Sequence, residues 1–135
     1  MKPKDIVAQF VADIQAQRFD EAKALLVSDG FEYVGPNMRF VNPDDLMAYQ
    51  FGMVAIQKAL ILRQLSAEEE QVFAILDYRT NFEPIGDVRL AVWFSVLGDK
   101  IQKIEAFYNA AVVENMLGGN LPQSTAEATA DKTAE

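Results

Sequence analysis

The second half of this chain contains four long segments rich in Ile, Val, Phe, Tyr and Trp, and this pattern constrains the fold more than any other feature. The segments span 54–65, 71–82, 88–97 and 100–109, and turn-forming residues separate each from the next. β-Branched and aromatic residues favour strands, and short turns between successive strands produce hairpins. The sequence therefore predicts a long antiparallel meander.

Helical patterns occupy the first half of the chain. Apolar residues recur at helical spacing after Pro3, which predicts an amphipathic helix over 3–17. A second, shorter helix is expected to be capped by Asp20, to run through Ala22, Leu25 and Leu26, and to end at Ser28-Asp29-Gly30, where Gly30 supplies the left-handed residue that commonly follows a helix. A short strand is then expected at 31–34.

A third helix is predicted to begin at Asn42 and to end near Gly52. Asn42 is a capping residue, Pro43 suits the first helical turn, and the acidic Asp44 and Asp45 complement the helix dipole. Helices followed by strands indicate an α+β fold. A curved sheet covered by three helices forms a cone that is open at one end and encloses a cavity.

Composition excludes several kinds of site. The chain has no Cys and no His, so disulfides, thiolate nucleophiles, imidazole metal ligands and a histidine general base are all absent. Its formal net charge of −8 argues against nucleic acid or an anionic membrane as a partner. The acidic triplet Glu68–Glu70 is interpreted as a solvated turn. We expect no metal and no cofactor.

Residues 1–119 are expected to form one domain. After Gly119 the composition shifts to Ala, Thr, Ser and charged residues without aromatics, which predicts a flexible acidic tail over 120–135. No apolar run approaches the roughly 20 residues that cross a bilayer. The sequence therefore predicts a soluble protein, most simply a cytoplasmic one.

The order of these elements resembles the nuclear transport factor 2-like superfamily, and so does the closing segment Gly98–Asn109, which runs from a Gly-Asp-Lys-Ile hairpin into the aromatic pair Phe107-Tyr108 and then Asn109. That superfamily includes SnoaL-like polyketide cyclases, ketosteroid isomerases and limonene-epoxide hydrolases. The resemblance implies a cone-shaped, cystatin-like α+β architecture for the body of the chain. It implies no single function, because this fold carries many.

The catalytic residues of these enzymes have no counterparts in this sequence. The three ionisable groups of the epoxide hydrolases fall on Leu76, Tyr78 and Ala106, and only Tyr33 matches their water-binding tyrosine. The first-strand aspartate of the ketosteroid isomerases falls in the stretch Tyr33–Pro36, which has no carboxylate. Scytalone-dehydratase-like chemistry uses His, which is absent. The resemblance therefore implies the fold without these activities.

Asp77 is the one weak candidate for a catalytic residue. It interrupts an apolar run, and Arg79 lies two positions on, so both side chains share one face of the strand. On the inner face the carboxylate would be a candidate base, and on the outer face it would form an ordinary ion pair. One register places it among apolar residues and another beside Arg89 and Trp93, and the sequence leaves both open. The epoxide-hydrolase resemblance favours the outer face.

Aromatic residues are the candidates for a ligand site. Tyr33, Tyr49, Tyr78 and Tyr108 fall in different elements, and together with Trp93 they are predicted to line the cavity of the cone. Apolar walls with a few hydroxyls suit a small, flat, mostly hydrophobic ligand. Arg63 and Arg89 are alternative contacts for a ligand carboxylate, although an exposed strand face explains them as well.

Three hypotheses follow. The first is a binder of a small apolar molecule that forms a homodimer through the outer face of the sheet. The second is a cofactor-independent isomerase, lyase or hydrolase that uses Asp77 with a tyrosine. The third is a protein-interaction adaptor without a ligand. A cavity of about 300 Å³ or more favours the first two, according to whether Asp77 points out or in, and a filled cone favours the third.

Overall fold

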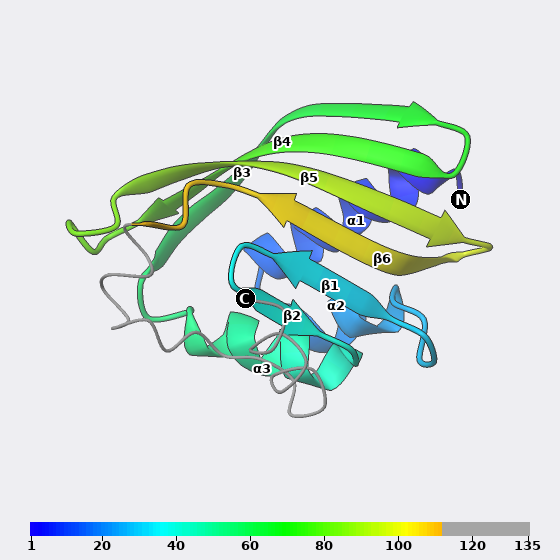
Figure 1. Ribbon diagram of the computed structural model, residues 1–135, viewed down its shortest axis with the longest axis horizontal. Helices are drawn as coiled ribbons and strands as arrows, with labels where there is room; N and C mark the ends of the chain where they lie inside the picture. The colour runs from blue at the N-terminus through cyan, green and yellow to red at the C-terminus, as the bar shows by residue number, and fades with distance from the viewer. Residues whose placement is uncertain (112–135) are drawn as a thin grey trace.

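A six-stranded sheet dominates the computed structural model, which describes residues 1–111 (Figure 1). The strands are β1 (Glu32–Gly35), β2 (Met38–Phe40), β3 (Gln57–Glu68), β4 (Gln71–Thr80), β5 (Asp87–Leu97) and β6 (Lys100–Phe107). Their order across the sheet is β2-β1-β6-β5-β4-β3. The helices are α1 (Pro3–Gln15), α2 (Phe19–Ala24) and α3 (Pro43–Gly52). The expected α+β architecture is confirmed.

The predicted meander is the larger part of the sheet. Strands β3 to β6 pair antiparallel in chain order, as the hairpin turns indicate. β1 pairs parallel with β6, so the complete sheet is mixed. In Figure 1 the long strands arch over α1. We call the face of the sheet that packs on the helices the inner face and the opposite one the outer face.

Several element boundaries differ from those expected. α1 ends at Gln15, because Gln17 takes a positive φ of 62° and Arg18 turns back to donate two side-chain hydrogen bonds to Asp13 Oδ1, at 3.1 and 2.9 Å. α2 begins at Phe19 with Arg18 as its N-cap, so Asp20 lies in the first turn and is not the cap that the sequence predicts. It ends at Ala24, short of the expected end at Ser28–Gly30, because Leu25 and Val27 share backbone hydrogen bonds with Ile101 of β6.

The sequence analysis also misplaces the start of β3 and does not predict β2. β3 begins at Gln57, three residues after the expected start, because Val54, Ile56 and Gln57 first donate backbone hydrogen bonds in turns after α3. The Gly35-Pro36-Asn37 stretch, expected to end a single strand, instead reverses the chain into β2, with Asn37 at a φ of 61°. A tight turn here adds an edge strand beside β1.

α3 begins where the sequence predicts. The side chain of Asn42 accepts a hydrogen bond of 2.9 Å from the backbone N–H of Asp45, and Pro43 occupies the first turn. This cap needs no partner from elsewhere in the fold. It fixes the start of the helix that carries Tyr49.

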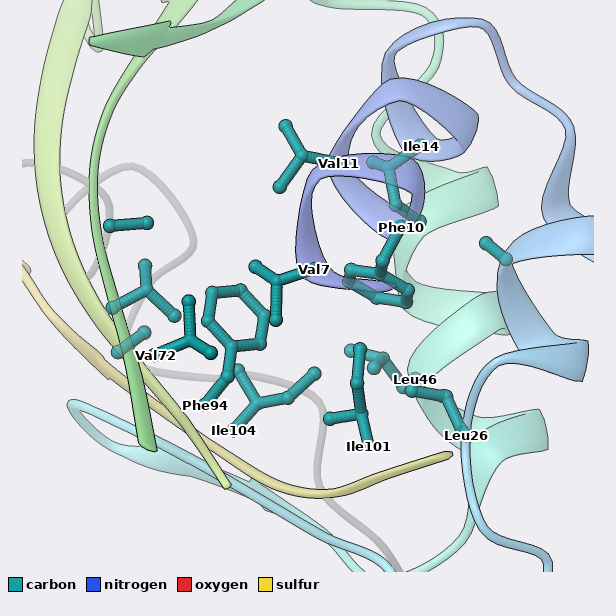
Figure 2. Close-up of a cluster of buried hydrophobic side chains, with 14 of the residues drawn as sticks. Val7, Phe10, Val11, Ile14, Leu26, Leu46, Val72, Phe94, Ile101 and Ile104 are labelled. Atoms are coloured by element: carbon teal, nitrogen blue, oxygen red, sulfur yellow. The ribbon is translucent and has the colours of Figure 1, made fainter. Parts of the chain in front are cut away.

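The core lies between α1 and the inner face of the sheet (Figure 2). Val7 and Val72 are fully buried, and Ile101 packs near Leu26 in the same cluster. Alternate residues of β4 and β5 supply this core, as the period of a strand requires.

No helix in the described part of the chain is long and apolar enough to cross a membrane. The expected domain boundary at 119 and the expected tail over 120–135 lie outside the described residues.

Candidate functional site

A cavity of about 120 Å³ lies between α1, α3 and the inner face of the sheet. Apolar side chains form most of its wall: α1 contributes Phe10, Val11 and Ile14, and β5 contributes Leu90 and Val92, among others. This volume is below the 300 Å³ that the sequence analysis takes as favouring a binder or an enzyme, because large side chains from both layers reach into the space.

Two phenylalanines separate this cavity from the filled core. Phe10 of α1 and Phe94 of β5 face one another (Figure 2), with ring centroids 6.2 Å apart and planes at 70°. Both rings belong to the buried core and also line the cavity. Edge-to-face contacts of this kind are favourable for aromatic pairs. The pair therefore forms the floor of the cavity.

Four tyrosines from four parts of the fold line the cavity. Tyr33 comes from β1, Tyr49 from α3, Tyr78 from β4, and Tyr108 directly follows β6. They are all the tyrosines of the chain. Only the folded arrangement of strands and helices brings these hydroxyls to one site.

Burial keeps these hydroxyls protonated. It raises the pKa of Tyr78 to about 12, and it also raises the pKa values of Tyr33, Tyr49 and Tyr108. The hydroxyl of Tyr78 is buried and has no hydrogen-bond partner within residues 1–111. The cavity therefore offers neutral hydroxyl groups that can donate or accept a hydrogen bond.

Phe40 of β2 connects two of the tyrosines. Its ring centroid lies 5.7 Å from that of Tyr33 and 5.7 Å from that of Tyr49. Tyr33 is also confined by Gly35, since a Cβ at that position would lie 3.2 Å from the tyrosine ring. The position of the Tyr33 ring is therefore set by close packing.

Trp93 does not line the cavity, which corrects the prediction from sequence. It lies on the outer face, 40% exposed, where its ring stacks on Phe73 at 5.9 Å and its indole N–H donates to Gln71 at 2.6 Å. A signal in the sequence was available: Val92, Phe94 and Val96 are all apolar, whereas Trp93 alternates with Ala91 and Ser95. The more apolar set faces inward.

Asp77 also lies on the outer face. The register pairs it with Arg89, and its carboxylate accepts hydrogen bonds of 2.7 and 3.0 Å from Arg89 and one of 2.7 Å from Arg63. The hydrogen bond from Arg89, together with that from Arg63, lowers the pKa of Asp77 to about 2. Arg79 shares this face but pairs with Asp87 instead, at 3.3 Å. Asp77 therefore has no access to the cavity.

Sequence reasoning missed three contributors to the wall. Gln50 and Met53 come from the end of α3 and the turn that follows it, and Ile85 comes from the turn between β4 and β5. Turn residues carry no periodic signal, so only the fold reveals them. No charged side chain of the described residues lines the cavity, and residues 1–111 contain no group of acidic residues arranged to hold a metal ion.

No protein-family model matches the sequence, and no curated protein matches it. Solved structures match the fold. An NTF2-like protein from Burkholderia thailandensis superimposes with a TM-score of 0.74 at 17% identity, covering 87% of this chain and 98% of that one. An epoxide hydrolase of the LEH-like type from Mycobacterium tuberculosis gives 0.68 at 17% identity, covering 87% of each chain.

A third similar structure contains a ligand. A protein with a ketosteroid isomerase-like fold from Catenulispora acidiphila, in complex with trimethylamine, gives a TM-score of 0.68 at 16% identity, covering 90% of this chain and 96% of that one. Identities this low show a shared fold and nothing more specific.

Proposed function

We propose that this chain, which has the nuclear transport factor 2-like fold, binds a small, mostly apolar molecule in the cavity between α1, α3 and the sheet. The observation that carries the proposal is the cavity itself, which is partly open and is lined mainly by apolar and tyrosine side chains. The polar groups at its wall within the described residues are neutral. Such a lining favours ligands that make hydrophobic contacts and few hydrogen bonds.

The volume limits the size of the ligand. An engineered apolar cavity of about 150 Å³ is large enough to hold benzene, and the cavity here measures about 120 Å³. We therefore expect a compact ring molecule of about the size of benzene, and a fused four-ring molecule such as a steroid exceeds this volume.

The position of Asp77 favours binding over catalysis. Proton abstraction requires a base within hydrogen-bond reach of the substrate. Asp77 lies on the outer face in an ion pair with Arg63 and Arg89, and no other carboxylate of the described residues lines the cavity. The Asp77 enzyme hypothesis therefore finds no support in the geometry.

One structurally similar protein is described in complex with a small molecule. The Catenulispora acidiphila protein of ketosteroid isomerase-like fold is described in complex with trimethylamine, which is itself a small molecule. A small ligand in a protein of this fold fits the volume of the present cavity.

Thermal unfolding in the presence of small cyclic probes tests the proposal. Cyclohexanone at millimolar concentration should raise Tm, because a ligand that binds only the folded state stabilises it. A steroid such as cholesterol should not. Absence of any shift with cyclohexanone and related six-membered rings would contradict the proposal.

Two variants that replace an alanine with leucine locate the binding site. Ala106→Leu adds bulk to the cavity wall and should abolish the shift with cyclohexanone. Ala91→Leu adds the same bulk to the exposed outer face of β5 and should leave the shift unchanged. If both variants lose the Tm shift with cyclohexanone equally, the binding site is not the cavity.

We also propose that the chain forms a homodimer through the outer face. Phe73, Trp93 and Phe107 are 45%, 40% and 51% exposed there, and the register places them on adjacent strands. We call these three residues the outer patch. A contiguous exposed aromatic patch of this kind is characteristic of an interaction site.

Charges at the two ends of the outer patch favour a second copy as the occupant. Arg63 and Arg89 share the single carboxylate of Asp77, which leaves a surplus positive charge at one end. The exposed turn after β3, including Glu69 and Glu70, lies at the other end, where Glu70 accepts a hydrogen bond from Val96. In a dimer with a two-fold axis through the outer patch, the positive end of one copy faces the negative end of the other.

Sedimentation at micromolar concentration tests the dimer. The wild-type chain should sediment as a dimer that weakens as salt is added, and Trp93→Glu should sediment as a monomer. Phe51→Glu is the matched control, because Phe51 is 70% exposed on α3, away from the outer patch, and its replacement should leave the dimer intact. A monomeric wild-type chain would refute the proposal.

We further propose a cytoplasmic location, as the sequence analysis expects. Fractionation of cells that produce the full chain tests this, and recovery in a membrane or secreted fraction would contradict it.

A further inference from the structure

The cavity opens toward the end of the sheet at which β4 ends and β5 begins. Leu60, Tyr78 and Val88 are neighbours across β3, β4 and β5 there, and all three are half-buried residues of the cavity wall. Met53, which follows α3, and Tyr108, which follows β6, are also half-buried residues of the wall. The floor of the cavity, in contrast, is buried.

Ile85 is the exception at this open end. It belongs to the turn between β4 and β5, yet it is only 7% exposed and lines the cavity. Glu83, Pro84 and Asp87 around it are exposed. A side chain beyond the end of a sheet is buried only where its turn folds back over the sheet. The turn therefore places the Ile85 side chain across the open end of the cavity.

Thr80 holds this turn in its folded-back form. Among residues 1–111, Thr80 and Asp13 are the two polar residues that are buried. The Thr80 hydroxyl donates a hydrogen bond of 2.7 Å to the carbonyl oxygen of Gly86, and the Thr80 backbone N–H donates one of 3.2 Å to the same oxygen. The backbone N–H groups of Ile85 and Gly86 both donate to the carbonyl oxygen of Phe82, at 3.0 and 2.9 Å. These bonds fix the backbone that carries Ile85.

A further hydrogen bond connects the turn to the opposite side of the opening. The backbone N–H of Asn81 donates to the carbonyl oxygen of Ile56 at 2.9 Å. Ile56 lies in the turns between α3 and β3, as does Met53 of the cavity wall. The turn cannot swing outward without losing this bond. The space for a ligand therefore ends at Ile85.

Building on the proposed ligand-binding function, we propose that Ile85 sets the size limit of the ligand, and that Thr80 is the positioning residue that holds Ile85 in place. With Ile85 across the opening, the space ends after one ring. Replacing Ile85 with alanine removes carbon atoms from the end wall and extends the cavity toward solvent, so a second fused ring fits. A close-packed wall rejects added methylene groups because they force side chains out of their preferred positions.

Cyclohexanone and trans-2-decalone form a graded pair of probes. Both carry one ketone, and trans-2-decalone adds a second, fused ring. Calorimetric or NMR titration gives the dissociation constant of each probe. The ratio of the two constants cancels a general loss of stability that weakens both probes alike. The wild-type chain should bind cyclohexanone more tightly than trans-2-decalone.

Truncation of Ile85 should reverse this preference. Ile85→Ala should shift the ratio toward trans-2-decalone by at least about tenfold, the effect of a methylene group in an apolar pocket. Ile75→Ala is the matched control, because it makes the same truncation on β4 outside the cavity. It should change the ratio by less than about twofold. Ile85→Val is a smaller truncation, which should shift the ratio in the same direction by more than about twofold and gives the test if Ile85→Ala does not fold.

Variants of Thr80 test its positioning role. Thr80→Val removes the hydroxyl and keeps the shape of the side chain, so it should also shift the ratio toward trans-2-decalone. Thr80→Ser keeps the hydroxyl and should retain the wild-type ratio. Thr80→Val combined with Ile85→Ala should shift the ratio no further than Ile85→Ala alone, because both changes act on one side chain. A merely structural Thr80 would lower stability and leave the ratio unchanged.

The outcomes separate this inference from the proposed function. If cyclohexanone binds the wild-type chain and the Ile85 variants leave the ratio unchanged, the role of Ile85 is wrong and the binding site stands. The role of Ile85 is also wrong if Ile75→Ala changes the ratio as much as Ile85→Ala does. If neither probe binds the wild-type chain, the proposed function fails, and the inference about Ile85 fails with it.

Discussion

Asp77 and Tyr78 are consecutive residues of β4, and their side chains lie on opposite faces of the sheet. The Asp77 carboxylate accepts hydrogen bonds from Arg63 and Arg89 on the outer face, whereas Tyr78 lines the cavity. Successive residues of a strand must alternate in this way. Asp77 is therefore next to a cavity-lining residue in the sequence, but the sheet separates its carboxylate from the cavity.

This ion pair predicts a pH dependence of stability. The pKa of Asp77 is lowered from 3.8 to about 2 in the fold, so its contribution to stability is present above the unfolded value and is lost as the pH falls through that interval. Urea unfolding of the wild-type chain and of Asp77→Asn should therefore differ more at about pH 5 than at about pH 3. A difference that is constant over this range would contradict the prediction.

The tyrosines predict an alkaline limit to stability. Burial raises the pKa of Tyr78 from 10.0 to about 12 and raises those of the other three, so the unfolded chain ionises first. Their stabilising contribution is present below about pH 10 and declines as the pH rises above it. Phenolate absorbance should appear together with the loss of circular dichroism as the pH is raised. Phenolate formation in the folded chain near pH 10 would contradict this.

The aromatic floor predicts a large effect of truncation. Phe94 is 2% exposed and packs edge-to-face on Phe10, so Phe94→Ala should reduce the free energy of unfolding by about 3–5 kcal/mol and enlarge the cavity. Urea unfolding measures the loss. The exposed Phe51 is the control, because Phe51→Ala should cost less than about 1 kcal/mol. Equal losses in the two variants would contradict the packing described here.

Gly35 predicts an effect on the cavity through Tyr33. A Cβ at Gly35 would lie 3.2 Å from the Tyr33 ring and 3.5 Å from Met38, so Gly35→Ala must displace the ring. We expect a loss of about 1–3 kcal/mol in stability, as overpacking causes, and weaker binding of cyclohexanone.

Gly52 provides the comparison for Gly35. A Cβ at Gly52, the last residue of α3, meets no atom within 4 Å. Gly52→Ala should therefore increase stability by about 0.5–1 kcal/mol, because alanine favours the helix. Urea unfolding measures the stability of both variants. A loss of stability in Gly52→Ala would contradict the prediction for Gly52, and an unchanged stability in Gly35→Ala would contradict the prediction for Gly35.

Local signals predicted the start of α3 and the period of the strands correctly. Asn42 and Pro43 satisfy the needs of a helix terminus with atoms only a few residues away. The four tyrosines were expected in one cavity because they fall in different elements of a hollow fold. β3 was misplaced because the turn after α3 and the strand use similar apolar residues, and the backbone hydrogen bonds from Val54, Ile56 and Gln57 to Phe51 and Met53 continue the turn up to the strand.

The sequence by itself determined that a helical half precedes a meander. It also determined that one of the two sets of alternate residues in each strand is more apolar than the other. Tertiary structure decided that Trp93 and Asp77 lie outside and how much space remains inside. A shift of one residue in pairing moves a side chain to the opposite face, and pairing is settled by contacts between distant strands. Likewise, the cavity volume is the space left when side chains from both layers meet, which no local pattern records.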